Sequence, residues 1–142
     1  MPKSSLPRVS EHSEQANFIE AVYRIYNHRA DFIQTLLFAV PNGSWFGGSN
    51  PWAVFNKFKK EGFRQGVSDL IYLQPRGSFN CLAIEMKALD RKGKKNAVSD
   101  EQLEFLSAVS CNGGMSWTCY GCDEALDVFA AYMSYPVRGG KK

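Results

Sequence analysis

Long hydrophobic runs are absent from this sequence of 142 residues. The longest apolar stretch extends from Thr35 to Pro41, whereas a membrane-spanning helix needs roughly 20 apolar residues. The first residues of the chain are polar and contain no apolar segment of the kind that directs secretion. We therefore expect a protein that does not span a membrane and that resides in the cytoplasm.

Cysteine and histidine are also scarce, with four and two residues respectively. In a cytoplasmic protein the cysteines are expected to be reduced. Cys119 and Cys122 form a Cys-x-x-Cys pair, but neither a second such pair nor a His-x-x-x-His motif follows it. A small zinc protein that uses Cys111, Cys119 and Cys122 is therefore a weak alternative.

The signatures of several common enzyme classes are missing. The sequence contains no Gly-x-x-x-x-Gly-Lys-Ser/Thr loop, no His-Glu-x-x-His and no Gly-x-Ser-x-Gly. These motifs mark P-loop nucleotide hydrolases, zinc metalloproteases and serine hydrolases respectively. Nothing in the sequence therefore indicates any of these three classes.

Positive charge is unevenly distributed, although the net charge is only +3. Residues 57–95 contain ten Lys or Arg against four Asp or Glu, whereas residues 99–133 contain six acids and no Lys or Arg. This asymmetry is typical of a protein with one basic face for a polyanion. A solvated charged loop at residues 91–95 is the alternative. The residues that we expect to contact nucleic-acid phosphates are Lys57, Lys59, Lys60, Arg64, Arg91, Lys92, Lys94 and Lys95.

Hydrophobic periodicity predicts an ordered core over about residues 10–135, with loose termini at 1–9 and 136–142. A helix is expected over residues 13–28, a strand over 36–40, and a second helix from the Asn50-Pro51 cap to Gly62. Strands at 67–73 and 79–87 would form a hairpin, and a capping box of Ser99 and Gln102 would begin a third helix. A strand at 115–120 and a last helix follow. This order favours one α/β domain over residues 1–142, with a mixed sheet flanked by helices.

Aromatic residues are frequent between residues 45 and 63. Trp52, Phe55 and Phe58 recur at helical spacing and would lie on one face of the second helix. Trp45 and Phe46 could stack on an unpaired base, although packing in the core is the interpretation that we favour.

Charged residues occur inside two apolar segments that are predicted to be strands. Glu85 and Lys87 are separated by one residue, so they would project from the same side of the strand. Pairing across the hairpin would place Asp69 roughly opposite Glu85. A hard divalent cation such as Mg²⁺ relieves the repulsion between close carboxylates, and a neighbouring lysine can orient an attacking water.

A purely structural interpretation of these residues is also open. Glu85 and Lys87 could form an ion pair on an edge strand, with Asp69 as a turn residue. The apolar neighbours Leu82, Ala83 and Ile84 instead indicate a central strand. Unpaired charges are costly there and are more often functional.

This arrangement resembles the PD-(D/E)XK nuclease superfamily, and within it the VRR-NUC family. The resemblance covers about residues 10–133. It rests on a glutamate in Ser10-Glu11-His12-Ser13-Glu14-Gln15, on Pro41-Asn42-Gly43, on the lysine-bearing helix before Gly62, on Gly66-Val67-Ser68-Asp69-Leu70, on Ile84-Glu85-Met86-Lys87 and on Gln102 after a basic loop.

The resemblance implies a restriction-endonuclease-like fold, with an αβββαβ core, an additional helix after the first strand and a C-terminal helix. It implies a DNA endonuclease that hydrolyses phosphodiester bonds with Mg²⁺ or Mn²⁺. Stand-alone members of this size resemble bacterial or phage proteins that form homodimers and cleave branched DNA such as four-way junctions (Holliday junctions). The alternative function is a non-catalytic nucleic-acid-binding module that uses only the basic face.

The resemblance also assigns roles to individual residues. Asp69 and Glu85 would be metal ligands, the main-chain carbonyl of Met86 a third ligand, and Lys87 the residue at the attacking water. Gln102 and a glutamate of the first helix would complete the catalytic site; of Glu11 and Glu14, we choose Glu14. Alternatively, Gln102 only caps its helix and Glu14 is an exposed acid of the first turn. Ser68 stands where the family usually has proline.

Overall fold

A four-stranded mixed sheet forms the centre of the computed structural model, which describes residues 8–26, 31–41 and 49–139. The strands are β1 (Leu37–Ala39), β2 (Leu70–Tyr72), β3 (Leu82–Lys87) and β4 (Met115–Tyr120). They lie in the order β1-β2-β3-β4; β1, β2 and β3 are antiparallel neighbours, and β4 runs parallel to β3. The mixed α/β architecture expected from the sequence is therefore confirmed.

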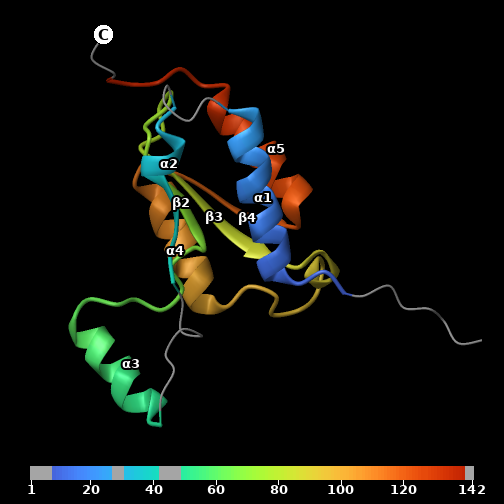
Figure 1. The fold of residues 1–142 in the computed structure, drawn as a ribbon. Coiled ribbons are helices and arrows are strands. Elements are labelled where there is room, and N and C mark those ends of the chain that lie inside the picture. Colours follow the sequence, from blue (N-terminus) through green and yellow to red (C-terminus); the bar gives the residue numbers. More distant parts are fainter. Residues whose placement is uncertain (1–7, 27–30, 42–48, 140–142) are drawn as a thin grey trace, which may run out of the picture.

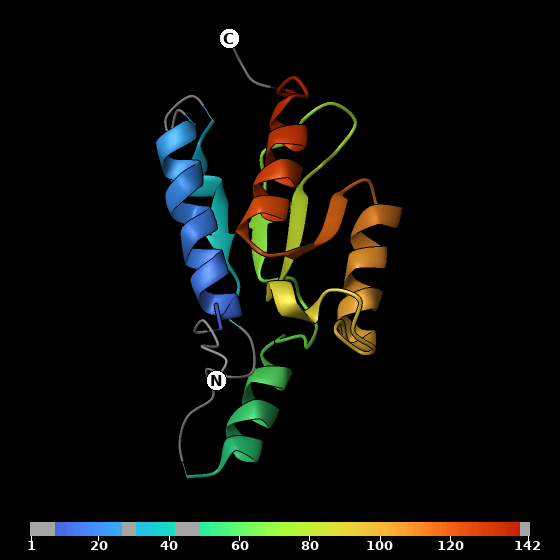
Figure 2. The same ribbon diagram turned by 90° about the vertical axis from the view of Figure 1, so that its right-hand side faces the viewer.

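Helices cover both faces of this sheet (Figure 1). Helices α1 (Glu11–Ile25) and α5 (Cys122–Met133) lie side by side over one face, while α4 (Asp100–Cys111) connects β3 to β4 across the other (Figures 1 and 2). Phe18 of α1 and Phe129 of α5 are fully buried, with their ring centroids 5.7 Å apart. All residues of β3 are buried because this strand has a neighbour on each side and helices on each face. The strand that carries Glu85 and Lys87 is therefore central.

The elements differ from the sequence prediction in several places. A single-turn helix, α2 (Ile33–Leu36), precedes β1 and was not predicted. The first helix begins at Glu11, because Ser10 Oγ accepts a hydrogen bond from the Ser13 main-chain N–H. Strands β2 and β3 are antiparallel neighbours as expected, and a tight turn closed by reciprocal hydrogen bonds between Arg76 and Phe79 joins them, but both strands are shorter than predicted.

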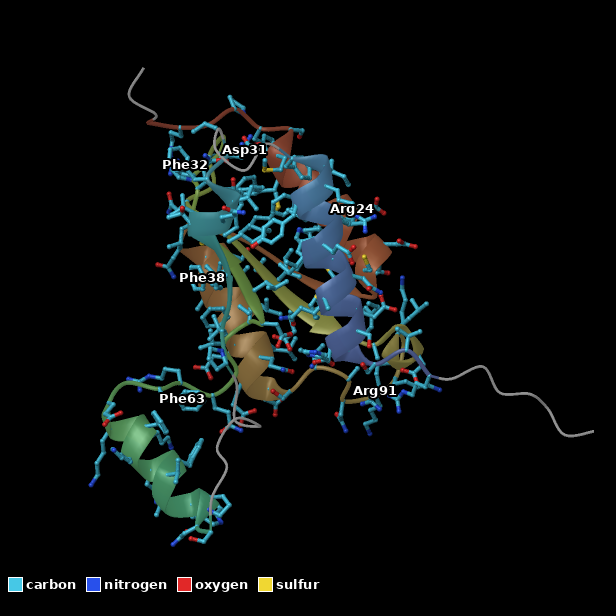
Figure 3. The ribbon with its side chains drawn as sticks, viewed as in Figure 1. Arg24, Asp31, Phe32, Phe38, Phe63 and Arg91 are labelled. Atoms are coloured by element: carbon cyan, nitrogen blue, oxygen red, sulfur yellow. The ribbon has the colours of Figure 1, made fainter. Side chains whose placement is uncertain are left out.

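A buried arginine lies in the connection between β2 and β3. Arg76 is only 5% exposed and donates hydrogen bonds to the main-chain carbonyls of Met133 (2.9 Å) and Tyr135 (3.0 Å). Its guanidinium also forms a 2.8 Å ion pair with Asp31. Asp31 lies at the end of the molecule opposite Phe63 and Arg91 (Figure 3). This polar cluster thus fixes the end of the sheet remote from Lys87.

Helix α3 (Pro51–Lys60) projects from the body of the protein (Figures 1 and 2). Asn50 Oδ1 accepts a hydrogen bond from the Ala53 main-chain N–H at 3.2 Å, which confirms the predicted cap. None of the helix residues is buried, and Trp52 is 74% exposed. The predicted aromatic face of this helix therefore does not pack in the core. Trp45 and Phe46 lie outside the described residues.

Among the residues that the structure describes, no helix has the length and apolarity needed to cross a membrane.

Candidate active site

Glu85 and Lys87 lie together at the C-terminal end of β3. Lys87 Nζ is 3.1 Å from Glu85 Oε1, and the two residues are 9% and 1% exposed. They project from the same side of the strand because side chains alternate faces with a period of two. The structure therefore confirms that the sequence places this buried charge pair on one side of a central strand.

Asp69 approaches the same pair from the adjacent strand. Leu70 pairs with Ile84 in the β2–β3 ladder, and the same register brings Asp69 opposite Glu85. Asp69 Oδ2 accepts a hydrogen bond from the Met86 main-chain N–H at 2.7 Å, and the Asp69 carbonyl accepts one from Val40. Asp69 is thus positioned through β1 and β3 together. The sequence prediction that Asp69 lies near Glu85 is confirmed.

Gln102 joins the site from the N-terminal turn of α4. It completes the predicted capping box, in which Ser99 Oγ accepts from the Gln102 N–H and Gln102 Oε1 accepts from the Ser99 N–H. Its Nε2 donates to Glu85 Oε1 at 2.6 Å, and its Oε1 accepts from Lys87 Nζ at 3.2 Å. The structural and functional interpretations of Gln102 are therefore compatible, because one side chain makes both sets of contacts.

A glycine allows α4 to lie this close to β2 and β3. Gly66 has a φ of +86°, a conformation that residues with a Cβ rarely adopt. A Cβ built at this position would lie 2.5 Å from the main-chain carbonyl atoms of Glu101, the residue before Gln102. Any larger residue would therefore push the start of α4 away from the segment that leads to Asp69.

The electrostatics of Glu85 are unusual for a carboxyl group. Burial raises the pKa of Glu85 to about 8; the neighbouring Asp69 adds to this shift, and Lys87 opposes it. Glu85 Oε2 is buried and has no hydrogen-bond partner among the described residues, and the same holds for the Ser68 hydroxyl. Such buried polar atoms are rare in folded proteins and call for an explanation.

The two candidate glutamates of α1 have different surroundings. Burial raises the pKa of Glu11, with Lys87 opposing the shift and Asp69 adding to it, so Glu11 lies within the electrostatic field of the site. Glu14 Oε2 instead accepts a hydrogen bond from the Cys122 main-chain N–H at 2.6 Å, at the first turn of α5. Both residues lie in the first turn of α1. Their surroundings favour Glu11 over the predicted Glu14 as the glutamate of the candidate active site.

The chemistry of this site fits a hard divalent cation. Among the described residues, no group of three or more His, Cys, Asp or Glu side chains could hold a metal by itself. Mg²⁺ does not need such a group, because it binds through one or two carboxylates and keeps several waters. A bound cation would give Glu85 Oε2 a partner and would offset the repulsion between Glu85 and Asp69. A zinc site at Cys111, Cys119 and Cys122 has no comparable support among the described residues, because these cysteines belong to no group of three or more His, Cys, Asp or Glu that could hold a metal ion.

The predicted basic residues lie in two groups. Arg91 and Lys87 line an open pocket of about 520 Å³, together with Arg8 and Glu11. Lys92 is paired with Glu124, while Lys94 and Lys95 are exposed. The second group lies on and after the projecting helix α3 and consists of Lys57, Lys59, Lys60 and Arg64. The sequence did not single out Arg8, which precedes the first helix and has no motif around it.

Comparison with known proteins agrees with the fold. No protein-family model matches the chain, and no curated protein matches it either. Among solved structures, the chain is similar to a protein described as a VRR_NUC domain protein, with a TM-score of 0.69 and 23% sequence identity. The similarity covers 89% of each chain. The chain therefore has the α/β fold of a VRR_NUC structure, as the sequence resemblance implied.

Proposed function

We propose that this protein is a metal-dependent nuclease that hydrolyses phosphodiester bonds in DNA. The observation that carries the proposal is the buried contact of Glu85 with Lys87 and Gln102, in which Glu85 Oε2 remains without a protein partner. The fold similarity to a VRR_NUC domain protein supports the same class of enzyme. Asp69, Glu85 and the Met86 carbonyl would hold Mg²⁺ or Mn²⁺. When bound there, the cation supplies a water of lowered pKa and a positive charge for the scissile phosphate.

Lys87 is the residue that would contact the reacting groups. Its ammonium is held between Glu85 Oε1 at 3.1 Å and Gln102 Oε1 at 3.2 Å, which restricts the rotamers of its long side chain. A fixed ammonium can orient the attacking water and stabilise charge on the phosphate oxygens. Gln102 is a positioning residue in this scheme, because it acts through Lys87 and Glu85. The resemblance implies that the P–O3′ bond breaks and leaves 5′-phosphate and 3′-hydroxyl ends.

In this proposal Glu11 has the role that the sequence analysis assigned to Glu14, the glutamate of the first helix that completes the catalytic site. It lines the pocket that contains Lys87, and its carboxyl interacts electrostatically with Lys87 and Asp69. A carboxylate there can accept a hydrogen bond from a water at the phosphate. Glu14 would act only through the first turn of α5.

The proposed substrate is branched DNA such as a four-way junction, and the proposed assembly is a homodimer. Both are supported by the resemblance to stand-alone VRR-NUC proteins. Phosphate contacts would come from the half-buried Arg91 and from the exposed residues Lys57, Lys59, Lys60, Arg64, Lys94 and Lys95, with Lys92 contributing if its pair with Glu124 opens. The charge asymmetry along the chain supports a basic DNA-binding face.

The proposal is tested by incubating labelled junction, flap and linear duplex DNA with the protein and Mg²⁺ or Mn²⁺. Wild-type protein should cleave, and the variants Asp69→Asn and Lys87→Ala should bind DNA without cleaving it. Glu104→Gln, an exposed acid on α4, is the matched control and should cleave like the wild type. If the wild type and all variants bind DNA in a salt-dependent way and none of them cleaves it, the protein is instead a non-catalytic binding module. Light scattering of the active protein tests the homodimer.

A further inference from the structure

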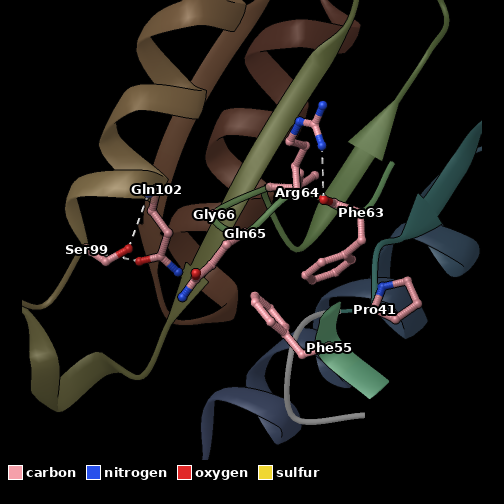
Figure 4. A pocket seen from close by; sticks show the side chains of 9 residues that line it. Pro41, Phe55, Phe63, Arg64, Gln65, Gly66, Ser99 and Gln102 are labelled. Carbon is pink, nitrogen blue, oxygen red and sulfur yellow. Dashed lines mark hydrogen bonds between the residues drawn. The ribbon is translucent and has the colours of Figure 1, made fainter. Parts of the chain in front are cut away.

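A second pocket lies beside the candidate active site and is not used by the proposed reaction. Its volume is about 210 Å³, large enough for a single nucleobase. Figure 4 shows the rings of Phe55 and Phe63 on one side of it and the side chains of Ser99 and Gln102 on the other. Residues of α3, of the segment before β2 and of α4 therefore meet around one hollow.

Gln102 connects this pocket to the candidate active site. The side chain lines the pocket, and its amide contacts both Glu85 and Lys87. Gly66 and Val67 of the pocket precede Asp69 by only a few residues. A nucleotide whose phosphate lies at Lys87 thus has this pocket within reach of its own base or of the adjacent one.

The walls of the pocket suit a flat aromatic ligand. Phe55 and Phe63 pack edge to face, with ring centroids 5.9 Å apart. Both residues are half-buried, so part of each side chain stays accessible from the pocket. Aromatic side chains outside a core are the usual platforms for nucleobases, which stack on them regardless of base identity.

The rim of the pocket suits the rest of a nucleotide. Lys59 Nζ lies 5.6 Å from the centroid of the Phe55 ring, and Arg64 Nη1 donates to the Phe63 carbonyl at 3.2 Å. These cations match the charge of a phosphate, while the amides of Gln65 and Gln102 can donate to and accept from a base edge. A plain apolar ligand would use neither group.

We infer that this pocket binds an unpaired nucleobase next to the scissile phosphate. The inference rests on the proposed nuclease function and narrows its substrate class. A base inside a duplex has its faces covered by neighbouring base pairs and its edge occupied by its partner, so it must leave the helix to enter a pocket. The protein therefore prefers DNA in which the nucleotide beside the cut is already unpaired.

The test uses oligonucleotides that contain 2-aminopurine, whose fluorescence is quenched when the base stacks. The probe is placed as a single unpaired nucleotide in a duplex, and the matched probe is paired at the same position. Binding is measured without a divalent cation, so that no cleavage occurs. Wild-type protein should bind the unpaired probe more tightly and change its fluorescence.

Two variants remove the aromatic faces and keep apolar bulk: Phe55→Leu and Phe63→Leu. Each should raise the Kd for the unpaired probe about fivefold to tenfold, given the usual strength of stacking on aromatic residues. The Kd for the paired probe should not change. Phe38→Leu is the control, because Phe38 is a partly exposed aromatic residue of β1 outside the pocket.

Equal affinity of the wild type for both probes, or equal losses in all three variants, would overturn the inference. Cleavage assays separate this failure from that of the proposed function. If the wild type and Phe63→Leu cleave paired and unpaired substrates alike, the nuclease stands and the base pocket is wrong. If nothing is cleaved, the nuclease and the substrate preference built on it both fail, even where the probe is quenched.

Discussion

The side-chain amide of Gln102 donates to Glu85 Oε1 at 2.6 Å while the same residue forms the capping box of α4 with Ser99. One side chain thus couples the start of a helix to the buried charges of β3. The position of Lys87 depends on this coupling, because its ammonium donates to Gln102 Oε1. The contribution of Gln102 to the helix cap can therefore be separated from its contribution to the candidate active site only by comparing variants of Ser99 and Gln102.

Gln102→Ala should lose stability and cleavage together. Loss of a helix cap typically costs about 1 kcal/mol, and Glu85 and Lys87 would also lose a buried hydrogen-bond partner each. We expect the free energy of unfolding to fall by about 2 to 3 kcal/mol. Urea unfolding and the DNA cleavage assay measure the two effects. Ser99→Ala removes only the cap, so it should cost about 1 kcal/mol and leave most of the cleavage activity. Equal activity in both variants would contradict the positioning role.

The stability of the metal-free protein should decrease with rising pH. Glu85 has a pKa of about 8 in the folded protein, against 4.5 as its ordinary value. Between these values the folded state holds a proton that the unfolded state has released, so the free energy of unfolding falls as pH rises. The expected fall from about pH 5 to about pH 8 is on the order of a few kcal/mol. Chemical denaturation across this range measures it.

Glu85→Gln is the matched variant for the pH experiment, because it cannot ionise and should flatten this part of the profile. Addition of Mg²⁺ at the high end of the range should raise the melting temperature of the wild type and not that of Glu85→Gln. Glu104→Gln, on the exposed surface of α4, should behave like the wild type in both measurements. A profile for Glu85→Gln that parallels the wild type would show that another group controls the pH dependence.

The glutamates of α1 should differ in the kind of defect that their loss causes. Glu11→Gln should lower the cleavage rate with little change in stability, because Glu11 lines the same pocket as Lys87 and interacts electrostatically with Lys87 and Asp69. Glu14→Gln should lower the free energy of unfolding by about 1 kcal/mol and retain cleavage, because its carboxylate accepts from the first turn of α5. Cleavage rates and thermal melting on the same preparations distinguish the two. The reverse pattern would restore Glu14 as the acid of the site.

Gly66→Ala should destabilise the protein by about 2 to 4 kcal/mol, the sum of backbone strain and a steric clash. Gly93→Ala is the control for strain alone, since Gly93 also has a positive φ of +74° but has open space around its Cβ position. The difference between the two variants in urea unfolding measures the close approach of Gly66 to α4. If both variants lose the same stability, the close approach contributes nothing.

Local patterns in the sequence were sufficient to predict the order of the main elements and the central charge pair. The alternation around Glu85 and Lys87 fixed their common side, and pairing of the strands placed Asp69 opposite Glu85. The capping box at Ser99 located the start of α4, and Gln102 followed from the resemblance. These features depend on periodicity and on short motifs, which a single sequence contains.

Features that depend on tertiary packing were not predictable in this way. The aromatic spacing in α3 indicated that Trp52, Phe55 and Phe58 share one face, but it could not show that no residue of the helix is buried, because the helix extends beyond the sheet (Figure 2). Helical spacing also could not show whether Glu11 or Glu14 is the glutamate of the site. Both lie in the first turn of α1, before the buried residues Phe18 and Val22. Arg76 lies between the two predicted strands of the hairpin, and its burial depends on contacts with Asp31 and the end of α5, which are distant in sequence.

The absence of buried residues in α3 has a consequence for how this protein can change over evolution. Substitutions in a helix that contributes no core residue are nearly neutral for folding, whereas substitutions around Glu85 are not. The DNA-contacting and base-binding surfaces proposed for α3 can therefore diversify while the reacting centre stays constant. Replacement of Pro51–Lys60 by another basic helix should accordingly alter the choice of DNA substrate with little change in the stability of the fold.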